Sequence, residues 1–148
     1  MSGTVPCFDG TNDSGAKGFY LVTEQALWRP AQPAAGREPS LAAFLQFGWA
    51  RNEISPLTRH LGSGLVWRSP FASRPRDALG LGATWVRFSS EPSAGFEYNY
   101  ELTLEAYYQI QLTRFFTLVP DLQFIHLPGG LRCQPDSVVF TPRLAISF

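Results

Sequence analysis

Polar side chains occupy every second position between residues 101 and 111. They are Glu101, Thr103, Glu105, Tyr107, Gln109 and Gln111. The alternation returns further along the chain with Asp121 and Gln123, and again with Thr141 and Arg143. Carboxylates, amides, hydroxyls and a guanidinium supply hydrogen-bond donors and acceptors. Rows of such groups at a two-residue spacing predict a wetted surface that exchanges hydrogen bonds with water or with a polar solute.

The recognised patterns of catalysis and metal binding are absent from the sequence. Leu61-Gly-Ser-Gly64 lacks the first glycine of a nucleophile elbow and lies within an expected strand. Gly80-Leu-Gly82 is followed by neither the third glycine nor the helix of a dinucleotide-binding loop. His60 and His126 have no cysteine or carboxylate partners at ligand spacing. We therefore expect no catalytic residues, no cofactor and no metal.

Apolar residues between the polar ones identify the elements that position them. From Tyr100 to Leu112 every even position is apolar or aromatic. A helix would need apolar residues at i, i+3, i+4 and i+7, whereas strict alternation sorts side chains onto the two faces of a strand. The pattern restarts over residues 116–124 and 138–148, so three long amphipathic strands are expected. Thr113 and Arg114 form the tight turn between the first two.

Four further strands are expected before Tyr100. They are approximately Lys17–Arg29, Ser40–Arg51, His60–Ser69 and Leu79–Ser89. Segments rich in Pro, Gly and short polar residues separate them, as is typical of turns and loops. Residues 1–16 are predicted to form an N-terminal loop and residues 17–148 a single β unit. The fold class is therefore all-β, with about seven antiparallel strands.

The length of these strands favours a membrane-spanning barrel. A tilted strand crosses the hydrocarbon with about 9–11 residues, whereas strands of soluble proteins usually have about 5–6. In lipid every strand edge must be paired, so such strands occur only in closed barrels. The apolar face would then meet lipid and the polar face a lumen. Trp28, Trp49, Trp67 and Trp85 fall toward strand ends, where aromatic rings form girdles at the two interfaces.

Composition argues against a nucleic-acid partner. Twelve basic and twelve acidic residues leave no formal net charge, so the chain lacks the basic excess that such partners require. The start Met-Ser-Gly-Thr-Val-Pro-Cys has neither the basic nor the apolar region of a signal peptide.

Several motifs occur in order along most of the chain. They are Gly18–Arg29, Gly64–Arg68, Leu104–Tyr108, Gln111–Thr113, Pro120–Ile125, Pro128–Gly130 and the terminal Phe148. This ordered set resembles the C-terminal part of the carbohydrate-selective outer-membrane porins of the OprB family. The resemblance implies an antiparallel transmembrane β-barrel, here the C-terminal arc of a larger, sixteen-stranded porin barrel. It also implies passive diffusion of carbohydrates and small solutes across the outer membrane of a Gram-negative bacterium.

The resemblance assigns the polar face to the wall of the channel. The channel-lining residues expected are Glu101, Glu105, Tyr107, Gln109, Gln111, Asp121, Gln123, Thr141 and Arg143. Their polar groups would exchange hydrogen bonds with sugar hydroxyls, and Tyr107 would offer a ring face to a pyranose; alternatively, they only keep the wall wet and pair with one another. The constriction is expected in N-terminal loops that this chain lacks. The implied partners are sugars, the outer-membrane bilayer and, through Phe148, the barrel-assembly machinery.

The resemblance places the terminal Phe148 at the periplasmic end, and counting strands back then assigns every connection a side. Cys7 and Cys133 both fall on the extracellular side, where a disulfide is chemically permitted. The strands beside them are, however, well separated around a wide barrel, and a disulfide needs close Cα atoms. Arg143 is expected to pair with lumen-facing carboxylates on the two preceding strands. Two glycine pairs, Gly62 with Gly64 and Gly80 with Gly82, are expected on the lumen face toward opposite ends.

Two other interpretations remain open from the sequence. One is a small soluble barrel that binds an apolar ligand, as lipocalins do, with its apolar face turned inward. The other is a gene fragment that does not fold alone, because seven strands with two open edges and an apolar belt favour aggregation. For the missing signal peptide, either a longer parent chain carries it or the reading frame is a remnant.

Overall fold

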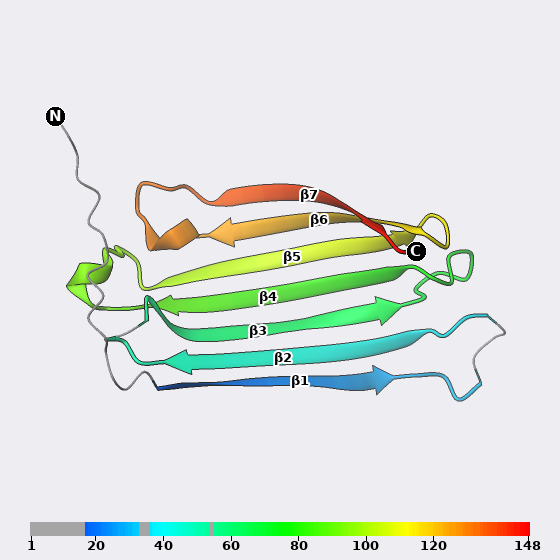
Figure 1. Cartoon of the computed structure of the whole chain (residues 1–148), viewed down its shortest axis with the longest axis horizontal. Helices are drawn as coiled ribbons and strands as arrows, with labels where there is room; N and C mark the ends of the chain where they lie inside the picture. Colours follow the sequence, from blue (N-terminus) through cyan, green and yellow to red (C-terminus); the bar gives the residue numbers. More distant parts are fainter. Residues whose placement is uncertain (1–16, 33–35, 54) are drawn as a thin grey trace.

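One seven-stranded antiparallel sheet makes up the fold. The computed structural model describes residues 17–32, 36–53 and 55–148. In Figure 1 each strand lies beside its neighbours in sequence, in the order β1 to β7. The strands are β1 (Gly18–Trp28), β2 (Ser40–Ala50), β3 (Leu57–Arg68), β4 (Ala78–Phe88), β5 (Tyr100–Gln111), β6 (Phe116–His126) and β7 (Ser137–Ile146). Two 3₁₀ turns, η1 (Pro92–Ala94) and η2 (Pro128–Gly130), lie in the connections, and within the described residues no helix could span a membrane.

The seven expected strands are confirmed, with one clear difference in their bounds. β3 begins at Leu57 rather than near His60. The buried Thr58 explains the extension, because its hydroxyl donates to the carbonyls of Arg87 and Phe88 at 3.2 and 3.4 Å. The register shifts between Leu57 and Arg59, as it does at a β-bulge. The bulge lets β3 continue three residues beyond the expected start.

The sheet is open. Within the described residues β1 pairs only with β2, and β7 only with β6. The expected arc of a barrel is therefore confirmed, and the small closed barrel with a buried apolar interior is not the observed fold. We name the end of the sheet that carries Phe148 and the β3–β4 and β5–β6 connections the proximal end, and the other the distal end (Figure 1).

The two faces of the sheet differ sharply in polarity. Residues directly opposite one another on antiparallel strands share a face, and residues two apart along a strand return to it. One face carries large apolar side chains that stay about half exposed, among them Leu81, Leu104, Leu122 and Leu144. In the described residues the buried hydrophobic side chains are only Ala42, Ala78 and Phe88. An apolar face this extensive, without a core beneath it, indicates contact with lipid.

Tryptophans on the apolar face lie in two rows near the strand ends, as the sequence predicts. Trp28 and Trp67 both lie opposite Leu41, near the proximal end. Trp49 lies opposite Arg59, and Trp85 opposite Leu61, toward the distal end. Two aromatic rows separated by an apolar band are the arrangement of a membrane-spanning barrel.

The pairing of β5 with β6 is interrupted beside a proline. Pro120 on β6 lies directly opposite Pro142 on β7. The β5–β6 ladder pairs Tyr107 with Asp121 and resumes with Ile110 and Leu118. The gap falls beside Pro120 because proline has no N–H to donate to a ladder.

Candidate functional site

The nine predicted lining residues project from one face of the sheet, opposite the apolar one. Tyr107 lies opposite Asp121, and Asp121 opposite Thr141, so these three form a row across β5, β6 and β7. Glu105 lies opposite Gln123 in the next row. The remaining members follow at two-residue steps along the same strands: Glu101, Gln109, Gln111 and Arg143. We name this surface, defined by the nine residues, the polar wall.

An ion-paired group lies at the centre of the polar wall. Arg143 Nη2 donates to Asp121 Oδ2 at 2.7 Å and lies 3.9 Å from Glu105 Oε1. Asp121 is only 3% exposed, whereas the Arg143 side chain is 56% exposed. The predicted pairing of Arg143 with carboxylates on β5 and β6 is therefore confirmed. Asp121 Oδ1 has no hydrogen-bond partner among the described residues, which leaves an acceptor that a hydroxyl or water can reach only by entering this site.

A patch of glycines adjoins the ion-paired group on the same face. Gly64 on β3 lies directly opposite Gly82 on β4, with Gly62 and Gly80 diagonal to them. The expectation that the two pairs lie toward opposite ends is wrong. β3 starts three residues earlier than expected, so its glycines fall near mid-strand and Gly64 comes level with Gly82. The row continues from Gly82 to Glu105 and from Gly64 to Phe44.

Two aromatic rings lie over glycines of this patch. A Cβ atom on Gly80 would lie 2.1 Å from Cε1 of the Tyr107 ring, and one on Gly64 would lie 2.5 Å from Cε1 of Phe44. Each ring therefore lies down across the neighbouring strand in space that only glycine leaves open. The Tyr107 ring therefore lies along the wall, over Gly80.

Two of the nine residues take part in connections as well as in the wall. Glu101 Oε2 accepts a hydrogen bond from the Gly129 N–H at 2.7 Å, which holds η2 against the distal end of β5. The Gln111 side-chain amide donates to Thr113 O at 2.6 Å and accepts from the Thr117 hydroxyl at 3.0 Å, which ties the β5–β6 turn. Their contacts are structural and lie at the two ends of β5.

Asp77 organises the proximal end, a role the sequence analysis missed because the residue lies in an expected loop. Its carboxylate accepts from the Gln111 N–H at 2.9 Å, the Tyr108 hydroxyl at 2.7 Å and Arg74 Nε at 2.7 Å. Burial opposes ionisation of Asp77, but these three donors outweigh burial and lower its pKa. The β3–β4 connection is thereby fastened to β5.

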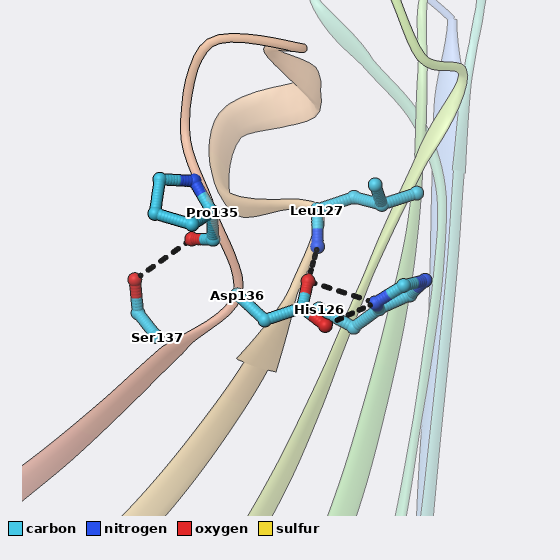
Figure 2. A network of polar contacts seen from close by, with 5 residues as sticks. All are labelled: His126, Leu127, Pro135, Asp136 and Ser137. Atoms are coloured by element: carbon cyan, nitrogen blue, oxygen red, sulfur yellow. Dashed lines mark hydrogen bonds and ion pairs between the residues drawn. The ribbon is translucent and has the colours of Figure 1, made fainter.

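At the distal end a second carboxylate orders the β6–β7 connection (Figure 2). Asp136 accepts from His126 Nδ1 at 2.9 Å and from the Leu127 N–H at 3.2 Å. These bonds lower the pKa of Asp136. They also hold Leu127 at a positive φ of 56°, which is uncommon for such a residue.

Of the two cysteines, one lies among the residues that the structure describes. Cys133 is exposed in the β6–β7 connection, whereas Cys7 lies outside the described residues, so their pairing remains a prediction. Within the described residues, no three His, Cys, Asp or Glu side chains gather as a metal site would require.

Comparisons with known proteins point in the same direction as the geometry. The family described as "Carbohydrate-selective porin, OprB family" matches residues 9–148. Porin B of Pseudomonas aeruginosa is 30% identical over an alignment that covers 46% of this chain and 19% of that protein. The structure titled "High pH structure of Pseudomonas putida OprB" superposes with a TM-score of 0.75 at 21% identity, covering 90% of this chain and 36% of that one. The chain thus spans a fifth to about a third of these relatives.

Proposed function

Because the chain belongs to the OprB family of carbohydrate-selective porins, we propose that it forms part of the wall of a channel for sugars and other small polar solutes. The channel lies in the outer membrane of a Gram-negative bacterium. Porins are channels rather than enzymes, and the transport proposed is passive diffusion without bond chemistry. The observation that carries the proposal is the division of one long-stranded sheet into a polar wall and an apolar, aromatic-edged face.

The polar wall supports the passage of a hydroxylated solute. Arg143 is a partly exposed donor that lies over the buried carboxylate of Asp121. Gln123 lies opposite Glu105 in the same region. A sugar hydroxyl that moves along this face exchanges water for these groups one at a time, so each site binds weakly enough to release. The nine residues of the polar wall are proposed as lining, not as the constriction.

The open edges require further strands. In hydrocarbon each unpaired backbone group costs several kcal/mol, and β1 and β7 each have one unpaired side within the described residues. We propose that strands from additional polypeptide pair with both edges and close the barrel. Phe148, at the proximal end, is proposed to engage the barrel-assembly machinery from the periplasmic side.

The test combines apparent mass with transport. An antibody against residues 100–148 identifies the product in outer membranes, and the sample is run with and without boiling. We expect a species severalfold heavier than the 16.4 kDa chain, and its migration should shift on boiling. In liposome-swelling assays the same species should admit sugars. A species of the chain's own mass, or liposomes that remain impermeable to sugars, would refute the proposal.

A further inference from the structure

The apolar face carries two arginines near its distal end. Arg59 on β3 lies directly opposite Arg87 on β4, and both are exposed. Among the strand residues that the structure describes, no other Asp, Glu, Lys or Arg lies on this face. Every other charged strand residue projects from the polar wall side. The pair is thus the one exception to this rule among the described strand residues.

Aromatic residues flank the two arginines in the same row. Trp49 lies opposite Arg59, and Tyr100 lies opposite Arg87. The row therefore reads Trp49, Arg59, Arg87, Tyr100 across β2 to β5, and Trp85 lies one step inward, opposite Leu61. Aromatic residues in a barrel mark the level of the lipid headgroups. The guanidinium groups accordingly lie at the edge of the hydrocarbon and not within it.

Within the described residues, no carboxylate neutralises the charges of the pair. Neither arginine forms an ion pair with a carboxylate of the described residues, whereas the adjacent Arg51 is paired with Glu53. Like charges directly opposite one another destabilise a sheet. An anion held between the two guanidinium groups would remove this repulsion. A hollow of about 330 Å³ lies beside them, and Trp49, Arg59 and Arg87 line it together with the ion pair of Arg51 and Glu53.

We propose that Arg59 and Arg87 bind the phosphate of a phosphorylated glycolipid of the outer leaflet. This inference rests on the proposed function, because that function places the distal end at the outer surface. Guanidinium groups bind phosphate through paired N–H donors, which suits two arginines on adjacent strands better than two lysines. The acyl chains lie along the apolar face below, and the flanking rings pack against the sugar and the upper acyl carbons. Among the described strand residues, the proximal row of Trp28, Leu41 and Trp67 carries no charge on the apolar face, so we expect it to bind no anionic headgroup.

Lipid binding to the detergent-purified folded barrel tests the inference. Native mass spectrometry counts bound molecules of diphosphoryl lipid A, monophosphoryl lipid A and phosphatidylcholine. The variant R59Q/R87Q is compared with R68Q/R76Q, which removes two charges from the proximal end. We expect R59Q/R87Q to lower the affinity for diphosphoryl lipid A at least about tenfold, because each lost charge-assisted bond weakens binding by roughly that factor. R68Q/R76Q is expected to bind lipid A as the unaltered protein does.

Three results would overturn the inference. They are equal lipid A binding by both variants, equal binding of phosphatidylcholine and lipid A, and displacement of lipid A by inorganic phosphate at matched concentration. The migration shift on boiling, recorded for each variant, shows that the barrels compared are folded. Conductance is measured on the same preparations. A barrel that conducts but binds no lipid A contradicts only this inference, whereas a folded barrel that binds lipid A but does not conduct contradicts only the proposed channel.

Discussion

Arg143 on β7 donates to the buried carboxylate of Asp121 on β6, with 2.7 Å between Nη2 and Oδ2. The two residues differ in exposure, since Asp121 is 3% exposed and the Arg143 side chain is 56% exposed. The pair therefore places a solvent-facing cation over a carboxylate that water barely reaches. It links the outermost strand of the sheet to its neighbour on the wall side.

Substituting Arg143→Gln leaves the Asp121 carboxylate without its cation. Loss of one partner of a fully buried pair costs about 3–5 kcal/mol, but water screens the exposed Arg143, so a decrease of about 1–2 kcal/mol in unfolding free energy is expected. The double variant D121N/R143Q should recover part of this loss. Denaturant unfolding of the reconstituted barrel gives the unfolding free energies of the two single variants and the double variant. If the effects of the single variants add up to that of the double variant, the two residues are not coupled.

Gly64 and Gly82 face one another, yet alanine should be tolerated at only one of them. A Cβ on Gly64 would lie 2.5 Å from both the Leu81 carbonyl oxygen and the Phe44 ring, whereas on Gly82 the nearest atom is 3.7 Å away. We expect Gly64→Ala to destabilise the barrel by about 1–3 kcal/mol. Gly82→Ala should be neutral or stabilise it by up to about 1 kcal/mol. Equal unfolding midpoints for the two variants would contradict the register.

A two-residue period in the sequence was sufficient to predict the seven strands and the facing of β5, β6 and β7, whereas the poor alternation of β1 left its facing open. It assigned all nine wall residues to one face, because facing depends only on parity along each strand. The register between strands could not be predicted in the same way, because it depends on bulges such as the one before Arg59. The expected glycine positions failed for this reason. Side-chain contacts with loops, such as those of Glu101, could not be read from the period at all.

Acid should weaken the proximal end through Asp77. Its folded pKa lies below the reference value of 3.8, so its contribution to stability is present above about pH 4 and is lost as the pH falls through the folded pKa. Asp77→Asn should cost about 1–3 kcal/mol at neutral pH, through lost charge-assisted hydrogen bonds. Unfolding followed from pH 7 to pH 2 is the measurement. Between pH 7 and pH 2 the Asp77→Asn variant should lose less unfolding free energy than the unaltered protein. An equal loss in the two proteins would show that Asp77 does not cause it.

Asp136→Ala should loosen the β6–β7 connection without affecting the strands. The substitution removes the acceptor of both His126 Nδ1 and the Leu127 N–H (Figure 2). We expect the Leu127 amide to exchange its hydrogen faster, while amides in the middle of β6 keep their protection. Exchange read by mass spectrometry checks this. Ser137→Ala, which removes only the hydroxyl bond to the Pro135 carbonyl, is the control and should leave Leu127 protected.

The central claim is that the polar wall faces water while the opposite face meets lipid. Neighbouring residues test it most directly, because Gln123 and Leu122 on β6 project from opposite faces. With both native cysteines replaced by serine, Gln123→Cys and Leu122→Cys are compared by single-channel conductance before and after a charged, membrane-impermeant thiol reagent. A drop in conductance for Gln123→Cys alone is predicted. An effect at Leu122→Cys, or none at Gln123→Cys despite labelling, would contradict the assignment of the two faces.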